Sequence, residues 1–197
     1  MAVADILITP ARVMYAATGS AEPDENNVGY GAAWGGNWIN VGYTTAPLAL
    51  NYERELFELE VEQVTLPIKG IITKETVMAE TKLAEMTAGN LRLAFGGTVT
   101  TTAAAVGQVA MEELEAGGSV VLPVYCWGFE GLYQTDAGAQ YPVRVFIWRG
   151  SAVLNGSLEF SKKDAVGIPL QITAWADTTK VIGKQILKIQ KITGPAA

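Results

Sequence analysis

The glutamates are the residues of this chain whose spacing could do chemistry. Five of them crowd one short stretch: Glu53, Glu55, Glu58, Glu60 and Glu62. Two carboxylates can hydrolyse a glycosidic bond when they lie at a fixed separation in a cleft and one has a raised pKa. Carboxylate oxygens also suit a hard cation. Glutamates that alternate along a strand meet neither requirement, so we interpret them as a solvated acidic face.

Other catalytic groups are scarce. The 197 residues include no histidine and one cysteine. This removes the commonest general base and metal ligand, and the Ser-His and Cys-His nucleophile pairs. Cys126 lies in the apolar stretch VVLPVYCWGF, where a small buried hydrophobe is expected. The glycines of WGGNW and AFGG lack the spacing of a phosphate loop. We therefore expect no enzyme, no cofactor and no metal site.

Composition predicts a folded chain with a substantial core. Hydrophobic residues make up 49% and charged residues 17%, and we expect one domain over residues 1–197. The net charge of -6 argues against tight binding to nucleic acid. Residues 1–130 carry 16 acids and 6 bases, whereas residues 131–197 carry 4 acids and 8 bases. Opposite patches could steer contacts between copies, although chance variation explains the asymmetry equally well.

Membrane insertion is not expected. No segment has the run of apolar residues that crosses a bilayer, and the start, MAVADILITPARV, lacks the basic region of a signal peptide. We expect the protein to be made in a cytosol-like compartment and used there or released by lysis.

Residues 18–45 predict a long loop, because glycine, asparagine and aspartate interrupt any periodic pattern. Loops of this length in compact domains are usually functional. Four aromatic residues anchor it: Tyr30, Trp34, Trp38 and Tyr43. Such residues dominate protein interfaces, so they are candidates for contacts between subunits. Equally, they could pin the loop to its own domain.

Residues 51–83 predict a long hairpin with a turn at Pro67–Gly70. Each strand has an apolar face and a polar face, and a β-bulge near Leu56 reconciles a change of phase. The apolar sets are Phe57, Leu59 and Val61, then Ile71, Val77, Ala79 and Leu83; the polar sets are Glu58, Glu60 and Glu62, then Lys74, Thr76, Glu80 and Lys82. The edges of so long a hairpin would aggregate unless another chain pairs with them. This pattern is typical of an assembly subunit.

The remaining elements predict a mainly β fold, a sandwich or barrel with one short flanking helix. We expect the helix over residues 83–95, with Thr81 as its N-cap and Gly96 as its stop. Residues 98–107 leave strand and loop open, and a turn is expected around residues 112–118. Strands are expected at residues 6–9 and 13–17, and then at 119–129, 141–148, 152–160 and 166–175 within a C-terminal unit, 119–192, whose tail leaves strand and helical turn open.

The chain resembles the tail tube (major tail) proteins of long, flexible-tailed bacteriophages. Four stretches carry this resemblance in the right order: ITPARVMYAATGSAEP with the glycine-rich loop after it, NVGYTTAPLALNYERE, then the acidic strand leading to ITKETVMAETKLAEMTAGNLRLAFGG, and finally GSLEFSKKDAVGIPLQITAWAD. Each stretch is weak alone, and their order and spacing make the match specific.

The resemblance implies hexameric rings that stack into a hollow tube in the virion tail, assembled in the host cytoplasm. Each subunit would lend its hairpin to a β-barrel around the lumen, through which genomic DNA passes without specific binding. An acidic wall repels phosphates. Lumen-facing residues would be Glu58, Glu60, Glu62, Lys74, Thr76, Glu80 and Lys82, and the partners would be further copies and the tape measure, tail-tip and terminator proteins.

Two other classes stay open. One is a related ring or tube component: a contractile-tail or secretion-system inner tube, or a tail terminator. The other is a monomeric β-sandwich binding or decoration module, for which Trp34 and Trp38 are the candidate aromatic platform.

Overall fold

The fold is mainly β and antiparallel. The computed structural model describes residues 10–194 except 27, 120, 136–137 and 161–165, so the strand expected at residues 6–9 lies outside the described part. Strands make up 54% and helix 5%, which confirms the expected fold class. The elements are β1 (Arg12–Ala17), β2 (Ile39–Asn40), β3 (Thr44–Val61), β4 (Val64–Leu83), α1 (Ala88–Phe95), β5 (Thr98–Thr102), β6 (Met111–Glu115), β7 (Tyr125–Gln134), β8 (Gln140–Leu154), β9 (Ile168–Ala174) and β10 (Leu187–Lys191).

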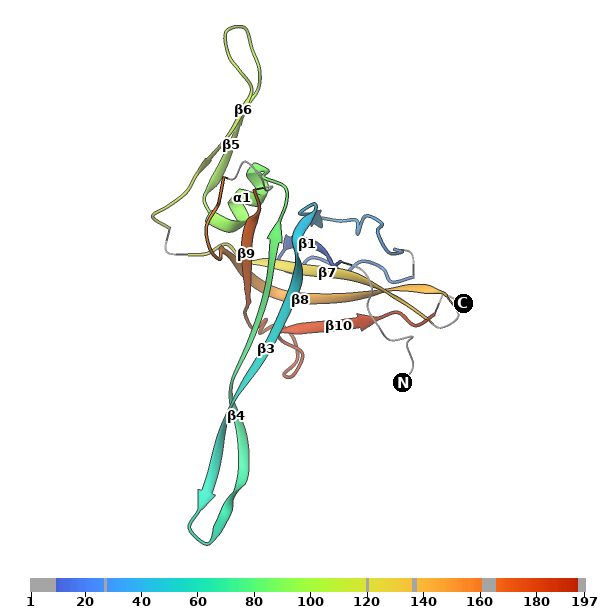
Figure 1. Cartoon of the computed structure of the whole chain (residues 1–197), viewed down its shortest axis with the longest axis vertical. Helices are drawn as coiled ribbons and strands as arrows, with labels where there is room; N and C mark the ends of the chain where they lie inside the picture. The colour runs from blue at the N-terminus through green and yellow to red at the C-terminus, as the bar shows by residue number, and fades with distance from the viewer. Residues whose placement is uncertain (1–9, 27, 120, 136–137, 161–165, 195–197) are drawn as a thin grey trace.

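A long strand, β8, connects the two halves of the main sheet. The strand order is β2-β1-β7-β8-β9-β4-β3, and β10 also pairs with β8. Residues 143–147 of β8 pair with β7 and β10, whereas residues 150–154 pair with β9. Figure 1 shows the result, with β3 and β4 crossing β7, β8 and β10 steeply. Sheets that cross this way enclose a core between their inner faces.

The core lies between these halves and under α1. Its largest buried side chains come from β7, β8, β9 and the upper part of β4, and include Trp127, Phe129, Ile147, Ile172 and Leu83. In β4, exposure alternates from Val77 to Leu83, so Val77, Ala79 and Leu83 point inward as their spacing predicted, whereas Ile71 of the same predicted set is 51% exposed. Alternating burial is what a strand with one covered face requires.

The hairpin is longer than expected and turns elsewhere. β3 begins at Thr44, and the turn is Glu62-Gln63, with Val61 opposite Val64. The predicted turn at Pro67–Gly70 is therefore wrong. Those residues belong to β4, where a ribbon edge tolerates a proline that cannot donate a hydrogen bond. A register shift lies between Glu55 and Leu56, where a bulge was predicted, but its extra residue is Thr73 of β4, so the predicted change of phase along β3 is wrong.

The helix is shorter than expected: Thr81, its expected N-cap, pairs with Leu170 of β9, and β4 ends at Leu83 as the predicted hairpin does. The helix proper is Ala88–Phe95, so the N-cap prediction at Thr81 is wrong. Its cap is Thr87, whose hydroxyl accepts a hydrogen bond from the Asn90 backbone N–H at 3.1 Å. The stop at Gly96 is confirmed: it has φ 73° and its N–H donates to the Arg92 carbonyl.

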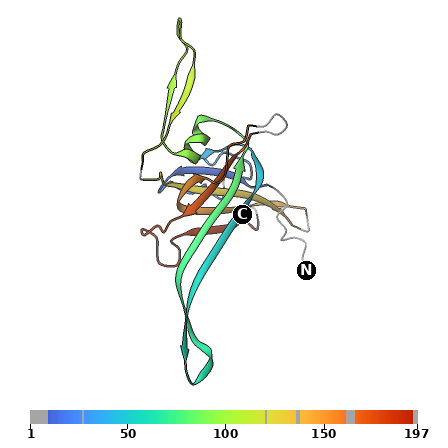
Figure 2. The same cartoon turned by 60° about the vertical axis from the view of Figure 1, so that its left-hand side comes forward.

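The segments left open by the sequence are now resolved. Residues 98–115 form a second hairpin, β5–β6. The turn expected from residue 112 is wrong for residues 112–115, which belong to the strand β6. The expected strands 141–148 and 152–160 are largely one strand, β8, and the tail holds the strand β10. Figures 1 and 2 show β5–β6 leaving one end of the body and the β3–β4 hairpin leaving the other.

Candidate assembly surfaces

The β3–β4 ribbon has two chemically different faces, which its register defines. Residues directly opposite each other in an antiparallel pair share a face. Leu50, paired with Ala79, packs against the core, and Tyr52 and Arg54 follow it on this inner face. The outer face carries Glu53 and Glu55 from β3, and Lys74, Thr76, Glu80 and Lys82 from β4.

Polar contacts hold the outer face together. Lys74 forms an ion pair with Glu55 at 3.0 Å, and both side chains are largely exposed. Glu80 accepts hydrogen bonds from the Gln171 side chain at 2.6 Å and from Asn155 at 3.2 Å. The polar surface of the ribbon therefore continues across β9 into the body.

The glutamates near the hairpin tip do not share this face. At the register shift between Glu55 and Leu56 the extra residue is Thr73 of β4, because Glu55 pairs with Lys74 and Leu56 with Ile72. β3 keeps its alternation there, so Glu58 and Glu60 have the parity of Leu50 and Tyr52. Glu62 lies in the turn. The register thus separates Glu58 and Glu60 from Lys74, Thr76, Glu80 and Lys82, which the sequence analysis had grouped together.

The ribbon also offers long unpaired edges. β3 ends the sheet order, so over 18 residues its outer edge has no partner strand among the described residues. The β4 edge is covered by β9 only from Met78 to Leu83. Beyond that point neither edge of the ribbon pairs with another strand of the described chain. Such edges are ready templates for strands of another chain.

The loop between β1 and β3 packs on the face of β1, β7 and β8 that is opposite to the main core. Trp34 is 5% exposed and its ring lies 5.4 Å from that of Phe146, with Trp38 edge-on at 5.0 Å. A Cβ at Gly128 would lie 2.2 Å from the Trp34 ring, so only glycine permits this packing. Trp34 contacts its own subunit, and we leave it out of the proposed intersubunit contacts. Trp38 is half-buried, whereas Tyr43 is 81% exposed and Tyr30 is also exposed.

A row of three charged residues, two of them buried, fixes this loop and was not predicted from the sequence. Arg12, Glu130 and Arg144 are neighbours across β1, β7 and β8. The carboxylate of Glu130 accepts from Arg12 at 2.8 Å and from the Arg144 Nε at 3.1 Å. It also accepts from the Gly31 N–H at 3.1 Å and the Trp34 indole at 3.3 Å. Arg144 in turn donates to the Val28 carbonyl. In the sequence, the available signal was a charged residue, Glu130 or Arg144, within each of two otherwise mostly apolar strands.

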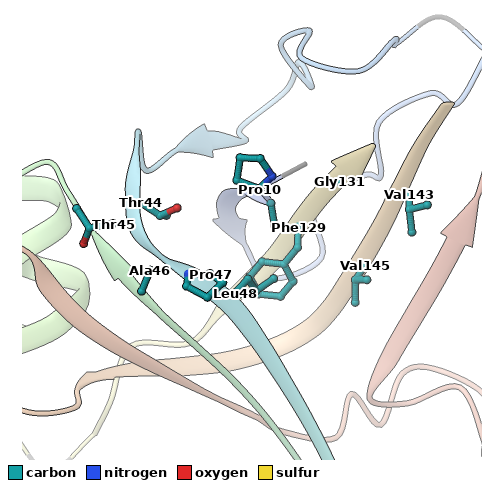
Figure 3. A pocket seen from close by; sticks show the side chains of 11 residues that line it. Pro10, Thr44, Thr45, Ala46, Pro47, Leu48, Phe129, Gly131, Val143 and Val145 are labelled. Carbon is teal, nitrogen blue, oxygen red and sulfur yellow. The ribbon is translucent and has the colours of Figure 1, made fainter. Parts of the chain in front are cut away.

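An apolar groove of about 550 Å³ opens beside the first residues of β3 (Figure 3). It is lined by Phe129 and Val145 on one side and by Pro47 and Leu48 on the other, and it has no charged side chain. Such a lining can bury an apolar segment, but it provides no group for acid–base chemistry. Among residues 10–194 as described, no cluster of acidic or cysteine side chains suits a metal ion.

Comparison with known proteins identifies this architecture. The chain matches the phage tail tube protein family over residues 4–188. It belongs to the phage tail tube protein family. No curated protein matches the chain.

Family membership explains surfaces that a monomer does not use. A tail tube protein is a structural component of the virion tail, and it associates with copies of itself and with other tail proteins. In the described part of the chain no helix is long and apolar enough to span a membrane. Trp34 and Trp38 meet at 77°, so this tail tube protein does not present them as a flat aromatic platform.

Proposed function

We propose that six copies form a ring, and that rings stack into the hollow tube of a long, flexible phage tail through which DNA is ejected. One observation carries the proposal: the β3–β4 ribbon extends the body sheet, carries a polar outer face from Glu53 and Glu55 across to Lys74, Thr76, Glu80 and Lys82, and keeps long edges that pair with no other described strand. Pairing ribbons of neighbouring copies would satisfy these edges and close a barrel. The number six rests on the resemblance to the family.

The outer face of the ribbon is the surface we assign to the bore. Its inner face continues the core face, so a closed barrel of ribbons must turn the outer face toward the axis. On this face Glu53, Glu55 and Glu80 outnumber Lys74 and Lys82. A ring repeats this excess of acids around the axis, and a wall with negative charge keeps DNA phosphates from binding.

The acidic hairpin tip is the competing candidate. Glu58, Glu60 and Glu62 are exposed, and Figure 1 shows the ribbon twisting on its way to the tip. If that twist turns the tip toward the axis, these three glutamates line the bore as the sequence analysis expected. Two matched variants separate the possibilities: Glu53→Lys with Glu55→Lys, and Glu58→Lys with Glu60→Lys.

Each variant reverses two charges, two positions apart, on the same strand. We expect tails of both variants to assemble, and only the Glu53/Glu55 variant to eject DNA slowly, with recovery at high salt because the new phosphate contacts are electrostatic. Slow ejection by the Glu58/Glu60 variant alone would assign the bore to the tip. Normal ejection by both would refute a bore lined by this ribbon. Sedimentation and negative-stain microscopy of the unmodified protein test the ring and the tube directly, and they distinguish a tube from a terminator, which forms single rings.

A further inference from the structure

The β5–β6 hairpin, which we call the arm (residues 98–115), ends in an apolar tip. Residues 103–110, AAAVGQVA, carry no charge, and Val106 is fully exposed with Val109 75% exposed. Past the paired strands, one isolated bridge joins Ala105 to Gln108. A two-stranded hairpin alone is marginally stable in water, so this arm gains if something covers its tip.

The root of the arm is held in a defined direction. At Gly97, φ is +85° and an added Cβ would lie 2.1 Å from the Glu115 carbonyl oxygen, so the two chains meet closely there. Figures 1 and 2 both show the arm pointing away from the body, opposite to the β3–β4 hairpin. Two projections at opposite ends suit contacts between successive layers of a stack.

A second exposed apolar pair lies in the loop between β9 and β10, on the side of the body from which the long hairpin leaves (Figure 1). There Val181 is 74% and Ile182 is 89% exposed. Turns prearrange this loop: the Lys180 N–H donates to the Asp177 carbonyl, and the Asp177 N–H donates to the Gln185 carbonyl. It is a shaped surface that its own subunit leaves uncovered.

The charges of these two surfaces are complementary. The arm strand β6 carries Glu112, Glu113 and Glu115, and residues 98–118 contain no lysine or arginine. Residues 176–191 contain four lysines and one acid, Asp177. Lys188 pairs with Glu22, and Lys180 lies 4.2 Å from the centre of the Trp148 ring, while Lys184 is exposed. Different, complementary surfaces at opposite ends favour a head-to-tail contact, which does not close on itself.

We infer that the arm of one copy docks on the 177–185 loop of a copy in the next ring, with Val106 and Val109 against Val181 and Ile182 and with Glu112 and Glu113 near Lys184. This inference rests on the proposed tube. It makes the arm the stacking contact, whereas the β3–β4 ribbon closes the ring. The apolar groove of Figure 3 is the alternative binding site for the tip.

The first test removes the tip. Val106→Ser with Val109→Ser should still form rings, and the protein concentration needed for tubes should rise at least about tenfold, since burying one valine is worth roughly that factor. The matched control is Val121→Ser, an exposed valine outside the arm. Tubes at an unchanged concentration would overturn the inference, and so would the loss of rings in a variant with the normal melting temperature. Failure of the unmodified protein to form rings or tubes would instead refute the proposed function.

The second test identifies the partner surface. A mixture of Val106→Cys and Ile182→Cys proteins should form disulfide-linked dimers in tubes and none in isolated rings; the native Cys126 is buried and does not compete. A mixture of Val106→Cys and Leu48→Cys probes the groove, and linkage there alone would overturn the assignment. Charge reversal adds a check: Glu112→Lys with Glu113→Lys should block stacking, and adding Lys184→Glu should restore part of it. No restoration combined with no Val106–Ile182 linkage would also overturn it.

Discussion

Replacing Glu130 with alanine should be among the most damaging single changes in this protein. The carboxylate is fully buried and accepts hydrogen bonds from Arg12, Arg144, Trp34 and the Gly31 backbone. Arg144 is also fully buried, so without Glu130 its charge loses its ion-pair partner inside the protein. Removing one partner of a buried pair typically costs about 3–5 kcal/mol.

This loss is larger than the net contribution of the Glu130–Arg144 ion pair to stability. Most of the cost is the desolvation of the charge left behind, because Arg12 is partly exposed and can reach water whereas Arg144 cannot. The loop between β1 and β3 would lose two further contacts, the Gly31 N–H and the Trp34 indole. For a domain whose total stability is about 5–15 kcal/mol, this loss approaches unfolding.

Urea denaturation followed by tryptophan fluorescence measures the effect. We expect Glu130→Ala to lower the free energy of unfolding by about 3–5 kcal/mol, and Arg144→Met made in that background to cost less than it does alone, because the two side chains act as a unit. Glu58→Ala is the matched control: it removes an exposed glutamate from the ribbon and should change stability by less than about 0.5 kcal/mol.

Two results would refute this reasoning. A loss below about 1 kcal/mol for Glu130→Ala would mean that the loop relaxes and lets water reach Arg144. Strict additivity of the Glu130 and Arg144 substitutions would mean that the row is not energetically coupled. Either result would also mean that these contacts do not hold the loop between β1 and β3 rigidly in place.

Three further outcomes are expected. Gly128→Ala should destabilise the fold by about 1–3 kcal/mol, seen in the melting temperature, since its Cβ would clash with the Trp34 ring; an unchanged melting temperature would show that the loop moves freely. Thr87→Ala should cost about 1 kcal/mol through the lost N-cap, and Thr87→Ser should recover most of it. Burial raises the pKa of Cys126 from 9.0 to about 12, so the thiol keeps its proton in the folded state while the unfolded chain loses it. The preference of the folded state for the protonated Cys126 thiol therefore stabilises the fold below pH 9, and this stabilisation is lost as the pH rises toward 12. The free energy of unfolding should fall less steeply over this range in Cys126→Ala.

Local patterns in the sequence predicted the features that a single strand or turn decides. Alternation along β4 placed Val77, Ala79 and Leu83 inward, because one covered face imposes a period of two. The place of the register shift near Leu56 was predicted, although its extra residue lies on β4, and Gly96 predicted the end of the helix. The mainly β fold and the resemblance to tail tube proteins were also readable from the order of such local elements.

Elements that depend on distant partners were misjudged. Pro67–Gly70 has the composition of a turn, but the pairing of β3 with β4 placed the turn at Glu62-Gln63, which carries no glycine or proline signal. Thr81 has the side chain of an N-cap, but pairing with β9 keeps it inside β4, and the helix begins only at Ala88. In both places the competing local signal was real, and a long-range backbone ladder outweighed it.

The tertiary structure alone decided which charged residues meet. Arg12 and Glu130 are 118 positions apart, and only the register of β1, β7 and β8 makes them neighbours of each other and of Arg144. The loop between β1 and β3 then covers Glu130 and Arg144. The same holds for the ribbon, where the register places Glu53 and Glu55 with Lys74 and separates them from Glu58. A sequence states which strand a charge lies on and its parity. Whether the residues of one parity face the core or the solvent depends on the strands that pair beside that strand.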